Sequence, residues 1–245
     1  MFSFWGYIKT FTGSFLMVFC LWINNGFGQE RLSVDTGISE YRQQKIIEAT
    51  EQISEVLEQS IETLKEIAQL IETEAESDYE KKLLRIWDAT FKGNHANEIL
   101  ERFESLQQQF NENLTHIRYA SQTMCETKTQ ASLKKVIKLA FVLMLRNRVT
   151  GEIVPYDAEG QTPSHEAIVN LCDHWFDSIG FLDQIASLVH ELTHWYLKTE
   201  DHAYVYQHAK YKALTAHEHK SNADSYAYFI KQVLLLKPLQ NRPEV

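Results

Sequence analysis

The chain has 245 residues, of which 44% are hydrophobic and 23% are charged, a balance typical of globular proteins with an apolar core. With only 4 prolines and 9 glycines, the composition excludes collagen-like chains and disordered chains rich in these residues. The formal net charge of −9 argues against a nucleic-acid-binding protein, because such proteins normally carry a basic surface that neutralises phosphates.

Residues 1–28 are typical of a secretory signal peptide. One positive side chain, Lys9, precedes an apolar stretch over residues 11–23, and two small residues, Gly26 and Gly28, follow it. This stretch is shorter than a membrane-spanning helix, which needs about 20 apolar residues. We therefore expect cleavage after Gly28, a secreted (extracellular or periplasmic) mature chain and no stable membrane insertion. An uncleaved anchor is the alternative.

Cleavage of the signal peptide would change the cysteine count. Two of the three cysteines, Cys125 and Cys172, would remain in the mature chain. An even number of cysteines in an oxidising compartment suggests one disulfide, and two buried thiols are the alternative.

The first half of the mature chain is predicted to be helical. Over residues 38–75, isoleucine and leucine recur at helical spacing with no proline or glycine between them, which fits one long helix or two stacked helices. We expect their apolar side to face a helix bundle rather than a coiled-coil partner. A second helix should end near Gly93 and a third should cover about 96–110. The apolar side of the second helix consists of Leu83, Leu84, Trp87 and Phe91.

Helical periodicity fades after residue 110, and short apolar runs follow. Residues 133–145 are almost continuously apolar after their lysines, and β-branched runs occur at 152–154 and 167–169. These runs indicate a small sheet, although a short apolar run does not distinguish a strand from a buried helix. The predicted fold class is therefore α+β and mostly helical.

Residues 190–194 match the pattern HExxH, which carries two zinc-binding histidines in metallopeptidases. On a helix from about Phe181 to Tyr196, the surrounding apolar residues form one stripe and both histidines lie on the opposite face. Their i, i+4 spacing brings both imidazoles to one metal ion. Glu191 lies beside them, where it can polarise a metal-bound water. A surface helix with two solvated histidines is the alternative.

A catalytic zinc ion usually takes three protein ligands and leaves one position for water. Asp201 would give a tight turn straight after the helix, whereas Glu218 or Asp224 would give the longer spacing of thermolysin-like enzymes. Spacing alone leaves the third ligand open among Glu200, Asp201, His202, His217, Glu218, His219 and Asp224.

Two downstream segments resemble the aspzincin metalloendopeptidases, the family of deuterolysin and peptidyl-lysine metalloendopeptidase. Residues 199–204, Thr-Glu-Asp-His-Ala-Tyr, look like the TxDxxY core of that family, and residues 222–229 resemble its NADSYEYF segment. Residues 170–176 are similar to its strand-end cysteine and following aromatic residues. The resemblance is specific from about residue 170 onwards and weak before it.

The resemblance assigns a role to each of five residues. It implies that His190, His194 and Asp201 bind one zinc ion per chain. It also implies that Glu191 is the general base and that Tyr204 donates a hydrogen bond to the oxyanion of the tetrahedral intermediate.

The resemblance further implies a lysine-binding residue and a disulfide. In lysine-specific members, two acidic residues of the NADSYEYF segment line the pocket for the lysine that follows the cut bond. The first corresponds to Asp224, but the second is Ala227, so we expect a weaker or different preference. Because Cys172 corresponds to a position that is normally bridged, a Cys125–Cys172 disulfide is implied.

The chain departs from the family around the third ligand. Lys198 and Val205 stand where the family has glycine, and the spacing from His194 to Asp201 is shorter than usual. If residue 198 has a positive φ, lysine there costs about 1 kcal/mol relative to glycine.

Other polar residues near the motif have simpler explanations. Asn222 is interpreted as the N-cap of a helix, where Asp224 would favour the helix dipole. His208, His217 and His219 are expected at the surface and are assigned no role.

Taken together, these features predict a secreted zinc endopeptidase that is a monomer and acts on polypeptides. Residues 29–245 would form one zincin-like domain with a small sheet over the HExxH helix. The helical part would cover 29–118, and the sheet and zinc site 119–245. The alternative is a secreted helical binding module whose metal site is structural or vestigial; a structural site is normally closed by a fourth protein ligand.

Overall fold

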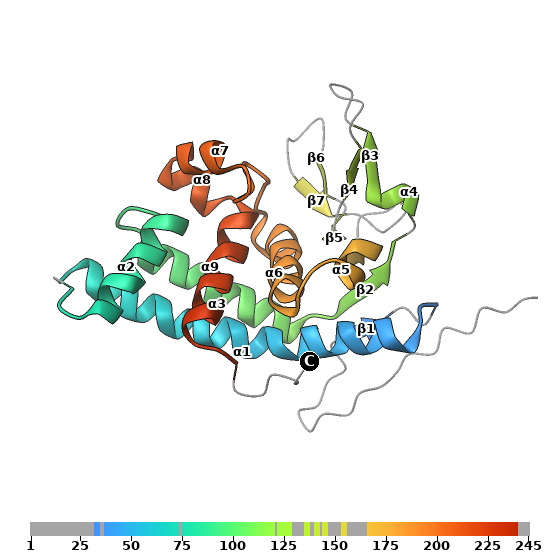
Figure 1. The fold of residues 1–245 in the computed structure, drawn as a ribbon, viewed down its shortest axis with the longest axis horizontal. Coiled ribbons are helices and arrows are strands. Elements are labelled where there is room, and N and C mark those ends of the chain that lie inside the picture. The colour runs from blue at the N-terminus through green and yellow to red at the C-terminus, as the bar shows by residue number, and fades with distance from the viewer. Residues whose placement is uncertain are drawn as a thin grey trace, which may run out of the picture.

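The computed structural model describes residues 32–34, 37–73, 75–120, 122–128, 135–137, 140–142, 144–146, 153–155 and 166–239. The predicted signal peptide lies outside these residues. In the described part, helices dominate and the strands form a small mixed sheet and two further pairs (Figure 1). The α+β, mostly helical class predicted from the sequence is confirmed. None of the described helices combines the length and the apolar character needed to cross a membrane.

The elements follow one another along the chain as helices first and then a mixture. The helices are α1 (Glu40–Ile71), α2 (Asp78–Thr90), α3 (Ala96–Glu112), α4 (Gln122–Cys125), α5 (Asp173–Asp177), α6 (Phe181–Leu197), α7 (His208–Ala213), α8 (Ala216–Lys220) and α9 (Ala223–Leu236). The strands are β1 (Leu32–Val34), β2 (Thr115–Tyr119), β3 (Glu126–Lys128), β4 (Lys135–Ile137), β5 (Ala140–Phe141), β6 (Met144–Arg146), β7 (Ile153–Pro155) and β8 (Ala167–Leu171).

Helix α1 is a single long helix, and α2, α3, α6 and α9 pack against it (Figure 1). Its apolar stripe is buried, which agrees with the bundle predicted from the sequence. A capping box between Ser77 and Glu80 starts α2. Gly93, with φ of +70°, lies in the turn between α2 and α3, where a positive φ favours glycine. The sequence therefore predicted this helical part closely.

The main sheet has the order β1-β2-β8-β5, with β5 antiparallel to its neighbour and the other strands parallel. All residues of the inner strand β8 are buried, including the polar Asn170, whose amide donates to the carbonyl oxygen of Phe141. Both β8 and β5 pack against α6, so the sheet covers the HExxH helix. Strands β4 and β5 fall in the apolar runs noted in the sequence, and β6, β7 and β8 overlap them, whereas β1, β2 and β3 were not predicted.

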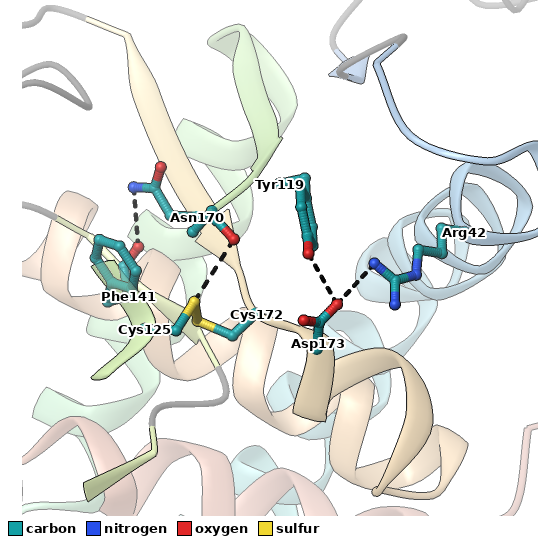
Figure 2. Close-up of a disulfide and its surroundings, with 8 residues drawn as sticks. Arg42, Tyr119, Cys125, Phe141, Asn170, Cys172 and Asp173 are labelled. Carbon is teal, nitrogen blue, oxygen red and sulfur yellow. Dashed lines mark hydrogen bonds and ion pairs between the residues drawn. A yellow bond between two sulfur atoms is a disulfide. The ribbon is translucent and has the colours of Figure 1, made fainter. Parts of the chain in front are cut away.

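A disulfide links the end of strand β8 to helix α4. It joins Cys125, at the end of α4, to Cys172, which follows β8, with their Cα atoms 5.8 Å apart. Figure 2 shows the next residue, Asp173, accepting a hydrogen bond from the Tyr119 hydroxyl at 2.9 Å and pairing with the Arg42 guanidinium at 2.8 Å. These contacts tie the end of β8 to both β2 and α1. The cysteine pair is the one that the resemblance implied.

Candidate metal centre

Helix α6 carries the two motif histidines and begins and ends close to its predicted bounds. Ile185, Leu188 and Leu192 on its apolar stripe are buried in the main core. His190 and His194 are also largely buried, with 8% and 9% of their surface exposed. The helix ends at Leu197, and the left-handed backbone of its C-cap residue Lys198 (φ 55°, ψ 37°) turns the chain towards Asp201.

Two imidazole nitrogens and one carboxylate oxygen meet at a common point. The Nε2 atoms of His190 and His194 are 3.1 Å apart. Oδ1 of Asp201 lies 3.1 Å from Nε2 of His190 and 3.4 Å from Nε2 of His194. Atoms bound at about 2.0–2.1 Å to a tetrahedral zinc ion lie about 3.3 Å from one another. The three distances therefore fit three corners of a zinc coordination tetrahedron.

The hydrogen bonding of His194 also suits a metal ligand. Its Nδ1 donates to the carbonyl oxygen of Thr199 at 2.8 Å, and a carbonyl can only accept. In the neutral ring Nε2 therefore presents its lone pair to the common point, as in many histidine–metal sites. Nδ1 of His190 lies 3.7 Å from Oδ1 of Asp224. The donor set suits zinc, although imidazole and carboxylate also bind other first-row metals.

The electrostatics of the group favour a cation. Burial lowers the pKa of His190, but a hydrogen bond to Asp201 and nearby carboxylate charges outweigh burial and raise the pKa to about 10. Burial raises the pKa of Asp201, but hydrogen bonds to His190 and His194 outweigh it and hold the pKa well below its usual range. In the metal-free protein, the proton on His190 thus supplies a positive charge at the place where a metal ion would bring one.

Glu191 is buried beside the two histidines. Its Oε2 accepts a hydrogen bond from the backbone N–H of Val142, at the end of strand β5, at 2.9 Å. Burial raises the pKa of Glu191 above its usual range, against the lowering effect of His190 and His194. A carboxylate with a raised pKa is suited to exchange protons near neutral pH.

Tyr204 lies beside His190 and Asp201, and its hydroxyl contacts the Asp201 carboxylate. It donates a hydrogen bond to Oδ2 of Asp201 at 2.8 Å. Its ring stacks on that of His190, with centroids 5.9 Å apart, and on that of Tyr206, at 5.3 Å. Burial raises the pKa of Tyr204, and the charge of Asp201 adds to this. In this structure Tyr204 orients the carboxylate of Asp201.

Asp224 lies in the first turn of α9 and contacts the loop that carries Asp201. Its Oδ2 accepts a hydrogen bond from the N–H of Val205. Ala227, three residues further along α9, is buried. Asp224 thus lies beside the group of His190, His194 and Asp201 but is not part of it.

The other candidate ligands have different partners. Glu218 forms a capping box with Thr215 at the start of α8, and Nε2 of His202 is 2.9 Å from the hydroxyl of Ser221. Among the described residues, only His190, His194 and Asp201 form a group of three histidine, cysteine or acidic side chains whose ligand atoms lie within 4.8 Å of one another.

Two residues near the site differ from the sequence expectation. His219 was expected at the surface, which is wrong, because it is fully buried against Tyr211 and Ser225. Asn222 does occupy the N-cap position of α9, but its side chain makes no capping hydrogen bond. The contacts of His219 and Asn222 could not be predicted from the sequence pattern, because they depend on how α7, α8 and α9 pack.

No protein-family model matches the chain, and no curated protein matches it.

Proposed function

We propose that this chain is a zinc-dependent endopeptidase with a zincin-like domain of the aspzincin type. The observation that carries the proposal is the convergence of His190, His194 and Asp201 at tetrahedral ligand distances, with the buried carboxylate of Glu191 beside them. The HExxH motif and the TxDxxY-like segment support the same assignment. Within the described residues the group offers three ligands, which favours a catalytic centre over a closed four-ligand site.

Each residue of the group has a chemical task. A bound zinc ion would supply a Lewis acid that polarises the substrate carbonyl and activates water. Glu191 takes a proton from the attacking water and passes it to the leaving amine. The backbone N–H of Val142 holds Glu191 in place for both transfers. Tyr204 keeps the Asp201 carboxylate oriented. Its hydroxyl has one proton, so to donate a hydrogen bond to the developing oxyanion it would have to turn away from that carboxylate.

The substrate would be an extended polypeptide. Strand β5 is the outer strand of the main sheet at the side of α6, and an extended peptide can add to such an edge. Asp224 would favour a basic residue after the cut bond, but Ala227 leaves that preference weaker than in lysine-specific enzymes. Mass spectrometry of the cleaved peptides tests this point, because a strict lysine requirement would contradict it.

The proposed location is extracellular or periplasmic. The signal-peptide pattern over residues 1–28 supports export, and the Cys125–Cys172 disulfide is compatible with an oxidising compartment. Edman sequencing of the secreted protein checks whether the mature chain begins at Gln29.

The peptidase proposal is tested by digestion of unfolded casein with and without a zinc chelator. Glu191→Gln should keep the metal and lower the cleavage rate by about 10²- to 10⁴-fold, because the proton acceptor is lost. Glu98→Gln, a change at an exposed carboxylate paired with Lys220, is the matched control and should cleave normally. If wild type and Glu191→Gln both hold zinc and are equally inert, a binding module with a structural metal site replaces the peptidase.

A further inference from the structure

The side chain of Asn222 holds the loop that carries Asp201. Its Oδ1 accepts hydrogen bonds from the backbone N–H groups of His202, at 2.9 Å, and Ala203, at 3.2 Å. Its Nδ2 donates to the carbonyl oxygen of Ala203, at 2.9 Å, and to the hydroxyl of Ser225, at 3.2 Å. The amide thus uses two acceptor and two donor positions, which is its full capacity. Three of the four bonds reach the two residues that follow Asp201.

The residue before Asp201 is held to the same place by backbone bonds. The N–H of Glu200 donates to the carbonyl oxygen of Ser221 at 2.7 Å, and the N–H of Ala223 donates to the carbonyl oxygen of Glu200 at 3.0 Å. These bonds form an isolated parallel bridge between Glu200 and Asn222. The backbone of Asp201 is therefore fixed on both sides by the segment that begins α9.

This support matters because Asp201 lies on a loop, whereas His190 and His194 lie on a rigid helix. The side chain of Asp201 is 40% exposed, so packing alone does not fix its position. A metal ligand has to be held within about 0.5 Å of its productive position, and loops are more mobile than helices. The hydrogen bonds of Asn222 supply the missing constraint.

Asn222 is itself firmly anchored. It is fully buried, and its partner Ser225 also contacts Nδ1 of His219 at 3.1 Å and accepts a hydrogen bond from the Tyr211 hydroxyl at 3.2 Å. The amide therefore connects the ligand loop to a buried polar network between α7, α8 and α9. A residue that served only to cap α9 would bond to the backbone of the first turn of that helix instead.

We propose that Asn222 is a positioning residue of the metal centre, which holds the carboxylate of Asp201 on the metal through the backbone of residues 202–203. This role rests on the metal binding proposed above. Partners of this kind, one step removed from the metal, typically change metal affinity by about 10- to 100-fold when they are replaced.

Asn222→Asp is the test, because it keeps the shape and one acceptor but removes both N–H donors. The N–H groups of His202 and Ala203 keep their acceptor, but the Ala203 carbonyl and the Ser225 hydroxyl lose their donor. The carbonyl then faces a carboxylate oxygen, and this repulsion displaces the loop. Gln184→Glu is the matched control: Gln184 is also a buried amide, and its Nε2 donates to the carbonyl oxygen of Trp175 at 2.9 Å, away from the ligand loop. Both changes put a carboxylate in place of a bonded, buried amide.

Zinc affinity is measured by competition with a chromogenic chelator, beside thermal unfolding of the metal-free proteins. Asn222→Asp should weaken zinc binding about 10- to 100-fold, whereas Gln184→Glu should leave it within about 3-fold despite a similar loss of thermal stability. The visible spectrum of the Co²⁺-loaded protein gives a second readout. Asn222→Asp should lower its tetrahedral absorption, because Asp201 no longer holds its position.

The outcomes distinguish a failure of the role of Asn222 from a failure of the proposed metal binding. A wild-type chain that does not bind zinc overturns the metal centre and, with it, the role of Asn222. A wild-type chain that binds zinc while Asn222→Asp and Gln184→Glu behave alike overturns the role of Asn222 alone. If Asn222→Asp does not fold, Asn222→Ser is measured instead, and an unchanged affinity in that variant likewise overturns the role.

Discussion

The proposed metal centre and the region around His219 bury the same kind of side chain in opposite electrostatic surroundings. Carboxylates, first Asp201, raise the pKa of His190 to about 10 although burial opposes them. Burial lowers the pKa of His219 to about 4, and the charge of Lys92 adds to this, against a smaller opposing effect of Glu218. Both histidines are buried, so the comparison teaches that the charged partners of a buried imidazole decide whether its charged form outweighs the effect of burial.

The two regions are joined through one short hydrogen-bond chain. Asn222 donates to Ser225, and the hydroxyl of Ser225 lies 3.1 Å from Nδ1 of His219. No hydrogen-bond partner among the described residues reaches Nε2 of His219. The surroundings of His190 thus favour a charged imidazole and those of His219 a neutral one, although Asn222 and Ser225 connect the two regions.

Removing the Asp201 carboxylate from the proposed metal centre should have the largest effect. Four-ligand zinc sites bind with about 10–16 kcal/mol, so one ligand accounts for about 3 kcal/mol, or about 100-fold in affinity. Asp201→Ala should weaken zinc binding by this factor or more, as measured by chelator competition. Asp224→Ala is the control, which should keep zinc and alter the cleavage preference. The reverse pattern would make Asp224 the third ligand.

Acid should destabilise the neutral region. The lowered pKa of His219, about 4 against 6.5, means that the unfolded chain binds more protons between these pH values. The stability that His219 contributes is therefore complete above about pH 6.5 and is lost as the pH falls towards about 4. Between pH 7 and pH 5, metal-free wild type should lose on the order of 1 kcal/mol more unfolding free energy than His219→Gln.

Denaturant unfolding of both chains at the two pH values, with chelator present, measures this difference. His95 is the comparison residue, because burial lowers its pKa as well, while Glu98 opposes and Lys220 adds to the shift. His95→Gln should therefore change the pH dependence less than His219→Gln does. Equal acid sensitivity of wild type and His219→Gln would show that His219 does not stay neutral in the folded chain.

The same contrast explains what could be predicted from the sequence. The histidine pair followed from local spacing, because residues four apart on one helix must share a face. The burial of His219 did not follow, because it depends on packing against Tyr211 of α7 and Ser225 of α9. The hydrogen bonds of Asn222 could not be predicted either, because they reach residues about 20 positions away in the chain. Strand β2 was missed because its partners β1 and β8 are distant in sequence.

The smallest expected effect concerns two lysines that have left-handed backbone conformations, one beside each region. Lys198 (φ 55°) precedes the loop that carries Asp201. Lys92 (φ 62°) follows α2, and its amino group donates to the carbonyl oxygens of Lys212 and Leu214, from where its charge acts on His219. Glycine tolerates a positive φ, whereas a residue with a Cβ is strained there. At each position the glycine variant should be more stable than the alanine variant by about 1 kcal/mol. Comparing glycine with alanine cancels the loss of the lysine amino group, which both variants share.

The two positions should differ in their effect on the neighbouring histidines. Lys92→Gly and Lys92→Ala should both raise the pKa of His219 towards its ordinary value, because the cation beside it is lost; NMR titration of the His219 ring measures this. Burial, the larger cause, should keep that pKa below 6.5. Lys198→Gly and Lys198→Ala should leave the His219 titration unchanged. A His219 pKa that does not respond to Lys92 would mean that burial alone keeps this histidine neutral. The contrast between the two regions would then depend only on the carboxylates around His190.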